Sequence, residues 1–376
     1  MACPVDRRAE ISIGKYLMSK LLEPKYILFD SVEQMLAPET LSDLLSKPVT
    51  RVGCQPMNGH SGLAGGQLSY VDTNAGRMVL KRMSIASDWI MFASADHLCR
   101  SVTLWQYGLL DQLCPHLEHK IISCSRDKDD WAILMHDLTG YVIAWDKPME
   151  PILVQAFLDA LARLHATYWN DLRLLDPRLG LCDPARLLDQ TSLPMAQKHT
   201  NSSMGVIPEW VRGGWDVMEE LLDSDAFTHM KSLIEDPQPL FGALSRYPCT
   251  LLHGDYRAEN LAHPDQPTAL DWQEATRSLM TIDLAWFAKQ DFVQDAMGQA
   301  QAINFYRRRL ETYLNQRFDD KEWRAMVDLG HLVDALRSAC FPAYWHKRTD
   351  DPNDRRRLEM KVKVRNQQVR DALRWL

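Results

Sequence analysis

The sequence predicts an α+β protein with two lobes, a small antiparallel-sheet lobe at the N-terminus and a larger, mostly helical lobe at the C-terminus. Three observations lead to this fold class. At 376 residues the chain exceeds the roughly 100–200 residues usual for one domain. Short apolar segments separated by polar turns prevail up to about residue 138, and longer segments with helical spacing prevail after it. We therefore expect lobes formed by residues 1–138 and 139–376.

A helix and a β-hairpin are predicted in the first part of the N-terminal lobe. The helix covers residues 38–46. Residues 68–72 and 77–83 are strand-like segments on either side of Thr73-Asn74-Ala75-Gly76. Asparagine and glycine tolerate positive φ angles, so this tetrapeptide can close a tight turn. The hairpin places Lys81 on a strand.

A helical region and a second hairpin complete this lobe. Apolar residues repeat at helical spacing across residues 87–113, which predicts one long helix or two short ones. Residues 120–123 and 131–135 then flank the polar turn formed by residues 126–130. The sheet should therefore contain both hairpins, with the helical region between them in sequence.

The C-terminal lobe is predicted to be helical, with amphipathic segments such as residues 151–169. One strand-rich segment, residues 250–272, interrupts the helices. The chain from residue 346 onward carries ten basic and five acidic residues. Spaced apolar side chains in residues 355–376 predict that this basic ending forms a solvated amphipathic helix.

Composition excludes several classes of protein. A net charge of −7 argues against a nucleic-acid binder. No apolar stretch approaches the roughly 18 residues of a membrane span. The eight cysteines include no C-x-x-C pair, which argues against a disulfide scaffold or a zinc ribbon. We expect a cytoplasmic globular protein with reduced cysteines.

The most informative segment is the strand-like sequence 251–253 and the polar loop that follows it. Asp255 lies in this loop, five residues before Asn260. In phosphoryl transfer from a nucleotide, one carboxylate orients the attacking hydroxyl, and an oxygen ligand one turn later holds Mg²⁺ against the phosphates. Asp255 and Asn260 suit these two roles.

A second carboxylate, Asp271, follows Asn260 by eleven residues. Residues 264–267 contain two prolines and predict a hairpin turn that returns Asp271 to the loop. Mg²⁺ prefers a few carboxylate or carbonyl oxygens together with phosphate oxygens and water. Asn260 and Asp271 therefore form a suitable partial shell, and with Lys81 they predict a phosphotransferase.

These residues resemble the motifs of the aminoglycoside phosphotransferase and choline kinase superfamily, including its ecdysteroid-kinase-like members. The match is to H-G-D-x-x-x-x-N at 253–260, followed by D-W at 271–272. Residues 133–138 resemble the hinge between the lobes, residues 161–166 resemble a helix of the large lobe, and residues 282–285 are a further matching segment. The resemblance covers roughly residues 50–345 and implies a protein-kinase-like fold with a nucleotide between the lobes.

The resemblance implies a role for each matching residue. Asp255 corresponds to the catalytic aspartate, Asn260 and Asp271 to the Mg²⁺ ligands, and Lys81 to the lysine that meets the α- and β-phosphates. The phosphoryl donor would be ATP or GTP. Arg257 stands where protein kinases have a phosphate-contacting lysine, so we expect it to neutralise charge on the transferred group, although an ordinary surface arginine is the alternative.

Two further residues are expected to support the loop. His253 is expected to be a buried, hydrogen-bonded residue that orients the loop, because catalysis by positioning needs fixed geometry. Asp283 is expected to brace the loop backbone.

The nucleotide is expected to meet two backbone segments. The glycine-rich segment 59–66 lies where a phosphate-covering loop belongs, and Ser61 and Gly62 are its candidate contacts. A glycine-rich hairpin turn without a ligand is the alternative. His136 and Leu138 would offer backbone groups to the adenine or guanine edge.

One expected feature is missing. Related enzymes pair the strand lysine with a glutamate of the first N-lobe helix, but Ser101 stands near that position. Asp96 is the better substitute by spacing, and Asp88 is the other. This gap supports an alternative function, a catalytically weak nucleotide sensor or scaffold. A metal-dependent hydrolase would lack histidine ligands and would leave Asn260 unexplained.

The acceptor is predicted to be a small hydroxylated molecule, uncharged and possibly apolar. An aminoglycoside is polycationic and fits poorly with the basic ending if that segment lines the cleft. Aromatic residues of the C-terminal lobe could form walls for a flat alcohol or a quaternary ammonium, or could simply be packed in the core. The candidates are Trp210, Trp215, Trp286, Tyr344 and Trp345.

Overall fold

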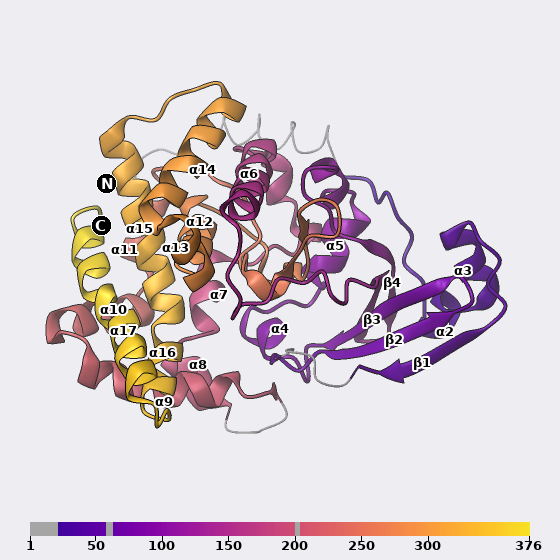
Figure 1. The fold of residues 1–376 in the computed structure, drawn as a ribbon, viewed down its shortest axis with the longest axis horizontal. Coiled ribbons are helices and arrows are strands. Elements are labelled where there is room, and N and C mark those ends of the chain that lie inside the picture. Colours follow the sequence, from indigo (N-terminus) through magenta and orange to yellow (C-terminus); the bar gives the residue numbers. More distant parts are fainter. Residues whose placement is uncertain (1–21, 58–62, 200–203) are drawn as a thin grey trace, which may run out of the picture.

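The computed structural model describes residues 22–57, 63–199 and 204–376. Figure 1 shows an antiparallel sheet at one end of the molecule and an extended assembly of helices at the other. The α+β fold class is therefore confirmed. The segment between the end of β5 at His136 and the start of α6 at Pro151 contains the predicted boundary near residue 138, and we retain residues 1–138 and 139–376 as proposed lobes.

The sheet has five antiparallel strands in the order β1-β2-β3-β5-β4, so both predicted hairpins are part of it. Lys81 lies on the central strand β3, opposite Leu68 of β2 and Ile133 of β5. The strands are β1 (Val52–Pro56), β2 (Gln67–Thr73), β3 (Gly76–Ser84), β4 (Ile121–Asp127) and β5 (Asp130–His136).

Short helices cover the sheet. Two short helices, rather than one long one, follow β3, because the chain changes direction at Ala95 and Cys99, which both have positive φ angles. The helices of this part of the chain are α2 (Val32–Met35), α3 (Pro38–Leu45), α4 (Trp89–Ala93), α5 (Arg100–Gln106) and the 3₁₀ turn η1 (Leu110–Leu113).

The two faces of the sheet belong to different hydrophobic clusters. Leu80 and Leu134 point to one face and pack with Met35 and Leu41 of α2 and α3. Side chains alternate along a strand, so Lys81 points to the opposite face. On that face Ile133 joins the large core that continues through the helices of the C-terminal part. Lys81 is therefore directed toward the region between the sheet and the helices.

The C-terminal part contains the remaining helices and a strand-rich insertion. Among the described residues no helix is both long enough and apolar enough to cross a membrane. The helices are α6 (Pro151–Thr167), η2 (Leu172–Leu175), η3 (Pro177–Leu179), α7 (Pro184–Asp189), α8 (Leu193–Lys198), α9 (Ile207–Leu221), α10 (Ser224–Glu235), α11 (Gln238–Leu244), α12 (Thr281–Ala288), α13 (Asp291–Met297), α14 (Gln299–Leu314), α15 (Asp320–Ser338), α16 (Cys340–His346) and α17 (Pro352–Leu373).

The strand-rich insertion consists of two small antiparallel pairs, β6 with β9 and β7 with β8. The predicted turn at residues 264–267 connects β7 and β8. The elements are β6 (Thr250–Leu252), η5 (Ala258–Asn260), β7 (Leu261–Ala262), β8 (Thr268–Ala269), η6 (Trp272–Glu274) and β9 (Thr276–Ser278).

The basic ending forms helix α17, which packs on α15 and α16 rather than standing free in solvent. Its buried Arg365 lies 2.8 Å from a carboxylate oxygen of Asp334 on α15. Arg370 pairs with Asp223 and Asp225 near the start of α10. Carboxylates of the surrounding helices thus balance much of the positive charge of α17, so this charge alone does not select the acceptor.

Helices α9 and α16 pack closely because Gly214 has no side chain. A Cβ atom at Gly214 would lie 2.0 Å from the carbonyl oxygen of Cys340. We predict that Gly214→Ala lowers the free energy of unfolding by about 1–3 kcal/mol through overpacking. In α11, a Cβ atom at Gly242 would meet nothing within 4 Å.

Gly242→Ala is the matched control for this prediction. It should raise the free energy of unfolding by about 0.5–1 kcal/mol, because alanine favours a helix more than glycine does. Urea unfolding followed by circular dichroism measures both effects. Equal effects of the two substitutions would contradict the packing argument.

Candidate active site

The loop that follows β6 is held by one buried carboxylate, that of Asp283 on α12. Its two oxygens accept the backbone N–H of His253 at 2.7 Å and of Gly254 at 3.0 Å. His165 of α6 contacts the same carboxylate at 3.4 Å, and its other ring nitrogen lies 2.5 Å from the hydroxyl of Tyr306. Asp283 therefore braces the loop backbone, as the sequence predicts.

His253 fixes the loop from the other side. Its Nδ1 accepts the backbone N–H of Asp255 at 3.3 Å, so the proton lies on Nε2, which donates to the carbonyl oxygen of Leu270 at 2.9 Å. The side chain is fully buried, and this burial lowers the pKa of His253. A neutral, doubly hydrogen-bonded imidazole therefore links the loop to the segment after β8.

Gly254 allows this close approach. It has a φ angle of +85°, and a Cβ atom there would lie 2.3 Å from the carbonyl oxygen of Glu274. Any other residue would be strained and would clash with the backbone. The glycine of the H-G-D sequence is thus required by the packing of η6 against the loop.

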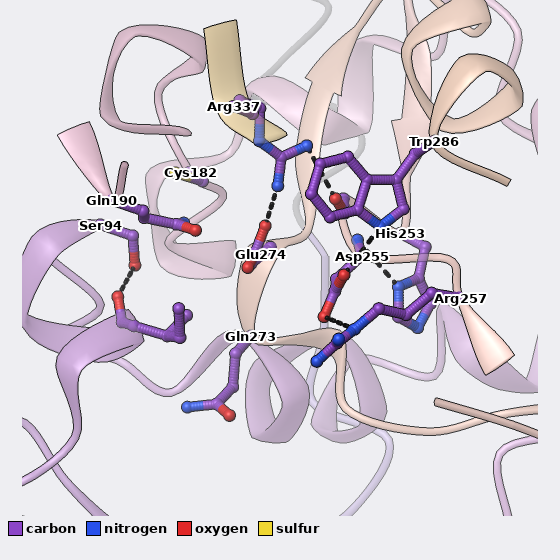
Figure 2. Close-up of polar contacts among 12 residues, drawn as sticks. Ser94, Cys182, Gln190, His253, Asp255, Arg257, Gln273, Glu274, Trp286 and Arg337 are labelled. Carbon is purple, nitrogen blue, oxygen red and sulfur yellow. Dashed lines mark hydrogen bonds and ion pairs between the residues drawn. The ribbon is translucent and has the colours of Figure 1, made fainter. Parts of the chain in front are cut away.

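The carboxylate of Asp255 receives three hydrogen bonds from side chains. Two of the donors, Trp286 and Arg257, are seen beside it in Figure 2. Trp286 Nε1 donates to Oδ1 at 2.9 Å. Arg257 Nε donates to Oδ2 at 3.0 Å, and Asn260 Nδ2 donates to the same oxygen at 2.8 Å. A carboxylate offers about four lone-pair sites, so one remains for another donor.

The charge of Asp255 is stabilised by its neighbours. Burial alone would raise the pKa of Asp255, but the guanidinium groups of Arg257 and Arg337 outweigh burial and hold this pKa below its usual range. Arg337 of α15 reaches the loop by donating to the carbonyl oxygen of Gly254 at 2.9 Å. Asp255 is therefore ionised and ready to accept a hydrogen bond at neutral pH.

Asn260 and Asp271 are brought together by the pairing of β7 with β8. Leu261 pairs with Ala269, and the backbone N–H of Leu270 donates to the carbonyl oxygen of Asn260 at 2.8 Å. Asn260 uses its side-chain nitrogen to hold Asp255, and its side-chain oxygen accepts no hydrogen bond from the described residues. Asp271 has a strained φ angle of +61° for a non-glycine residue.

These two residues fit a magnesium ion. A side-chain oxygen of Asn260 without a partner and a carboxylate of Asp271 offer the hard oxygen ligands that Mg²⁺ prefers. Within the described residues, no group of three or more His, Cys, Asp and Glu side chains is arranged to hold a metal. An ion bound by Asn260 and Asp271 would need phosphate oxygens and water to complete its coordination.

Lys81 pairs with Asp271 rather than with an acid of α5. Its Nζ lies 2.7 Å from Oδ1 of Asp271 and 2.9 Å from the side-chain oxygen of Gln273. The preference for Asp96 as its partner is wrong. Both oxygens of Asp96 accept the backbone N–H of Arg100, and the carboxylate pairs with the guanidinium of that residue.

The expected nucleotide contacts are only partly described. Ser61 and Gly62 lie outside the described residues. His136 donates its N–H to the carbonyl oxygen of Lys120, and the carbonyl oxygen of Leu138 accepts from Tyr141. The N–H of buried Leu138 has no hydrogen-bond partner in the described part of the chain, so it is free to meet a ligand.

The five candidate aromatic residues divide into three groups. Trp286 contacts Asp255 directly, and Lys289 Nζ and Arg337 Cζ lie 3.5 and 4.5 Å from its ring centre. Trp215 is buried in the core, where its N–H donates to Thr191, so the core-packing alternative holds for it. The remaining three, Trp210, Tyr344 and Trp345, pack against one another on α9 and α16.

The sequence reading did not identify Arg337, Glu274 or Gln273. Arg337 and Glu274 form a buried ion pair beside Gly254 (Figure 2). Burial raises the pKa of Glu274 to about 8, against the opposing effect of Arg337. The signal for Glu274 and Gln273 was their position directly after D-W, whereas nothing local in the sequence marks Arg337.

No protein-family model matches this sequence, and no curated protein matches it. Solved structures do match. The ethanolamine kinase of Plasmodium vivax superposes with a TM-score of 0.51 at 12% identity, covering 98% of this chain and 95% of its own. This chain has the kinase-like fold of that enzyme.

Two further kinases are similar at lower scores. The choline kinase of Cryptosporidium parvum has a TM-score of 0.49 at 10% identity, with coverage of 98% of this chain and 94% of its own. The choline kinase LicA of Streptococcus pneumoniae has a TM-score of 0.44 at 15% identity, and the match covers 92% of this chain and 100% of that enzyme.

The two N–H bonds to Asp283 give a testable prediction about the kinase-like loop. In Asp283→Asn one carboxylate oxygen becomes an NH₂ group that faces a backbone N–H, so one buried donor loses its acceptor. We expect a loss of about 1–3 kcal/mol in the free energy of unfolding, measured by urea titration.

Asp291→Asn is the control for this prediction, because the carboxylate of Asp291 is likewise held by two partners, Arg357 and Lys361, but lies near the surface. It should cost less than about 1 kcal/mol, as exposed ion pairs contribute little. A loss for Asp283→Asn no larger than that of the control would contradict the bracing role.

Proposed function

We propose that this protein is a phosphotransferase that transfers the γ-phosphoryl group of ATP or GTP to a hydroxyl group of a small molecule, with Mg²⁺. The observation that carries the proposal is the ionised carboxylate of Asp255, which is held by three side-chain donors. One of these donors, Asn260, accepts the backbone N–H of Leu270, the residue before Asp271, and Asp271 pairs with Lys81. The kinase-like fold supports the same reaction class.

Asp255 is the proposed catalytic residue. Its three side-chain hydrogen bonds fix the carboxylate and leave about one lone-pair site, which can accept the hydrogen of the acceptor hydroxyl. The bond would aim the hydroxyl oxygen at the γ-phosphorus. Because catalysis of phosphoryl transfer is mostly positioning and charge stabilisation, a fixed, ionised carboxylate is what the reaction requires.

Lys81 and Arg257 are the proposed charge-stabilising groups. The side chain of Arg257 is 37% exposed, so it can turn from Asp255 toward a phosphoryl group without leaving a buried site. Lys81 lies on a rigid central strand and can meet the α- and β-phosphates. Both cations would oppose the negative charge that spreads over the phosphate oxygens during transfer.

Asn260 and Asp271 are the proposed holders of Mg²⁺, which when bound neutralises charge on the β- and γ-phosphates. The amide nitrogen of Asn260 holds Asp255 in place, and its side-chain oxygen would be available to the ion at the same time. One side chain therefore ties the position of the hydroxyl-orienting group to that of the metal ligand.

The nucleotide base is proposed to lie against the segment after β5. The N–H of Leu138 has no partner in the described chain, and a purine edge offers acceptors that would satisfy it. His136 lies at the end of β5, and burial lowers its pKa, so it is neutral beside the base. Ser61 and Gly62 remain proposed contacts of the phosphates.

The acceptor is proposed to be uncharged. Trp286, the aromatic residue that touches Asp255, already carries Lys289 and Arg337 against its ring. A cationic acceptor would meet two like charges at this point, so a quaternary ammonium or a polycation is disfavoured. A neutral hydroxyl compound meets no such repulsion.

The alternative function, a nucleotide sensor or scaffold with weak activity, is favoured by one observation. No acid from α5 is paired with Lys81 in the described structure, and Ser101 stands near that position. A sensor would bind nucleotide tightly with Mg²⁺ but release no diphosphate in the presence of any acceptor.

The first test of the proposal is the release of ADP or GDP with Mg²⁺, with a sugar and a sterol compared with choline and an aminoglycoside. We expect acceptor-dependent release with an uncharged compound. Asp255→Asn should lower kcat by about 10²–10⁴-fold with nucleotide affinity unchanged, because a hydroxyl-orienting group is lost rather than a phosphate ligand.

Asp265→Asn is the control for Asp255→Asn, since Asp265 is an exposed aspartate of the β7–β8 turn. It should leave kcat unchanged. Absence of Mg²⁺-dependent nucleotide binding by the unmodified protein would overturn the proposed function, and equal loss of binding and turnover in Asp255→Asn would overturn the role of Asp255.

Arg257 gives a second prediction. Arg257→Ala should lower kcat by about 10–100-fold, because one charge-stabilising donor is removed from the transferred group. Arg257→Lys keeps the charge but loses the forked geometry, so it should recover part of the activity. Steady-state kinetics with saturating nucleotide measures both. Unchanged turnover in Arg257→Ala would show that this residue is an ordinary surface arginine.

A further inference from the structure

Lys81 makes a second contact that leads to a buried acid elsewhere in the fold. Its Nζ donates to the side-chain oxygen of Gln273 at 2.9 Å. The side-chain nitrogen of Gln273 in turn donates to Oδ2 of Asp88 at 3.3 Å. The amide thus accepts from a cation with one end and donates to a carboxylate with the other, so its dipole favours both contacts.

Asp88 is well placed to serve as a fixed support. Its side chain is fully buried at the start of α4, and its other oxygen accepts the backbone N–H of Met91 at 3.0 Å. Burial raises the pKa of Asp88, and the nearby charge of Lys81 opposes that rise. The charge of Lys81 therefore affects the pKa of Asp88, although the two side chains are not in direct contact.

The same acid lies against the end of the glycine-rich segment. A Cβ atom at Gly66 would lie 3.4 Å from Cε of Lys81 and 3.6 Å from Oδ2 of Asp88. The residue after Asp88, Trp89, donates its backbone N–H to the carbonyl oxygen of Ala64 at 2.8 Å. The start of α4 therefore joins the described end of the glycine-rich segment to the lysine.

We propose that Asp88 and Gln273 are positioning residues that together hold Lys81 toward the nucleotide phosphates, in place of a carboxylate on α5. This inference rests on the proposed function, because it assumes that Lys81 meets phosphates. Ser101, which faces the small cavity beside Lys81, has a buried hydroxyl without a partner in the described chain and offers no charge to the lysine.

Asp271 does not make this support redundant. As a proposed metal ligand, Asp271 would share the charge of its carboxylate between the metal ion and Lys81, which weakens its hold on the lysine. The side-chain oxygen of Gln273 has no other described partner, so it stays available to Lys81 when Asp271 binds the metal ion. The chain Asp88–Gln273–Lys81 would then be the contact that keeps the lysine extended across the cleft.

A double-mutant cycle with Lys81 tests this inference. The probe is the non-hydrolysable ATP analogue AMP-PNP with Mg²⁺, or its GTP counterpart, with affinity measured by calorimetry. Asp88→Asn keeps the helix cap but removes the charge, and Gln273→Met keeps the length but removes both polar ends. Each should weaken binding by about tenfold, as expected for a lost charge-assisted hydrogen bond.

The decisive measurement repeats both substitutions in a Lys81→Met background. If Asp88 and Gln273 act through Lys81, they should weaken binding there by less than about twofold. A tenfold loss that persists without the lysine would overturn the inference while leaving the proposed function intact. A wild-type protein that binds neither nucleotide would overturn both.

Asp96→Asn is the matched control, since Asp96 is an equally buried acid of the same region that pairs with Arg100 instead of Lys81. Its affinity for the probe should stay within about twofold of the wild type, with thermal melts confirming that each variant is folded. Weakening by Asp96→Asn equal to that by Asp88→Asn, and equally dependent on Lys81, would overturn the assignment of Asp88.

Discussion

Two backbone N–H groups held by the carboxylate of Asp283 are the constraint on which the rest of the site depends. They fix His253 and Gly254, and the next residue is Asp255. Asp283 lies on α12 and is itself contacted by His165 of α6. The position of the loop is therefore fixed by two helices that are distant from it in the sequence. A buried charge is costly unless its hydrogen bonds are satisfied, and here the loop backbone satisfies them.

The backbone geometry of the loop follows from this constraint. Glu274 approaches so closely that only glycine fits at position 254, and Asp271 adopts a left-handed conformation that places its carboxylate beside Lys81. The close packing at Gly254 and the positive φ angle of Asp271 both cost free energy, so they persist only because the surrounding structure fixes them. His253 supplies part of that structure by connecting Asp255 to Leu270. The loop and the segment after β8 therefore form one unit.

What the sequence could predict depends on how local the interaction is. The spacing of Asp255, Asn260 and Asp271 lies within one strand-rich segment, so a motif and a turn were enough to bring them together. The two hairpins and the strand position of Lys81 followed from turn signals in the sequence. By contrast, Gln273 and Asp88 are 185 residues apart in the sequence, so no local pattern predicts their contact. Sequence spacing favoured Asp96, which in the structure lies between α4 and α5 and pairs with Arg100.

The two ion pairs of the site each join a proposed phosphate-binding cation to an acid with another proposed role. Lys81 is paired with Asp271, and Arg257 is paired with Asp255. In each pair the cation is a proposed phosphate ligand, whereas the acid is proposed to serve a metal ion or a hydroxyl. Each cation neutralises the acid beside it, which avoids the cost of an unpaired charge at a partly buried site. If these residues act as proposed, binding of a metal-bound nucleotide would exchange the partners of the two cations rather than create new unpaired charges.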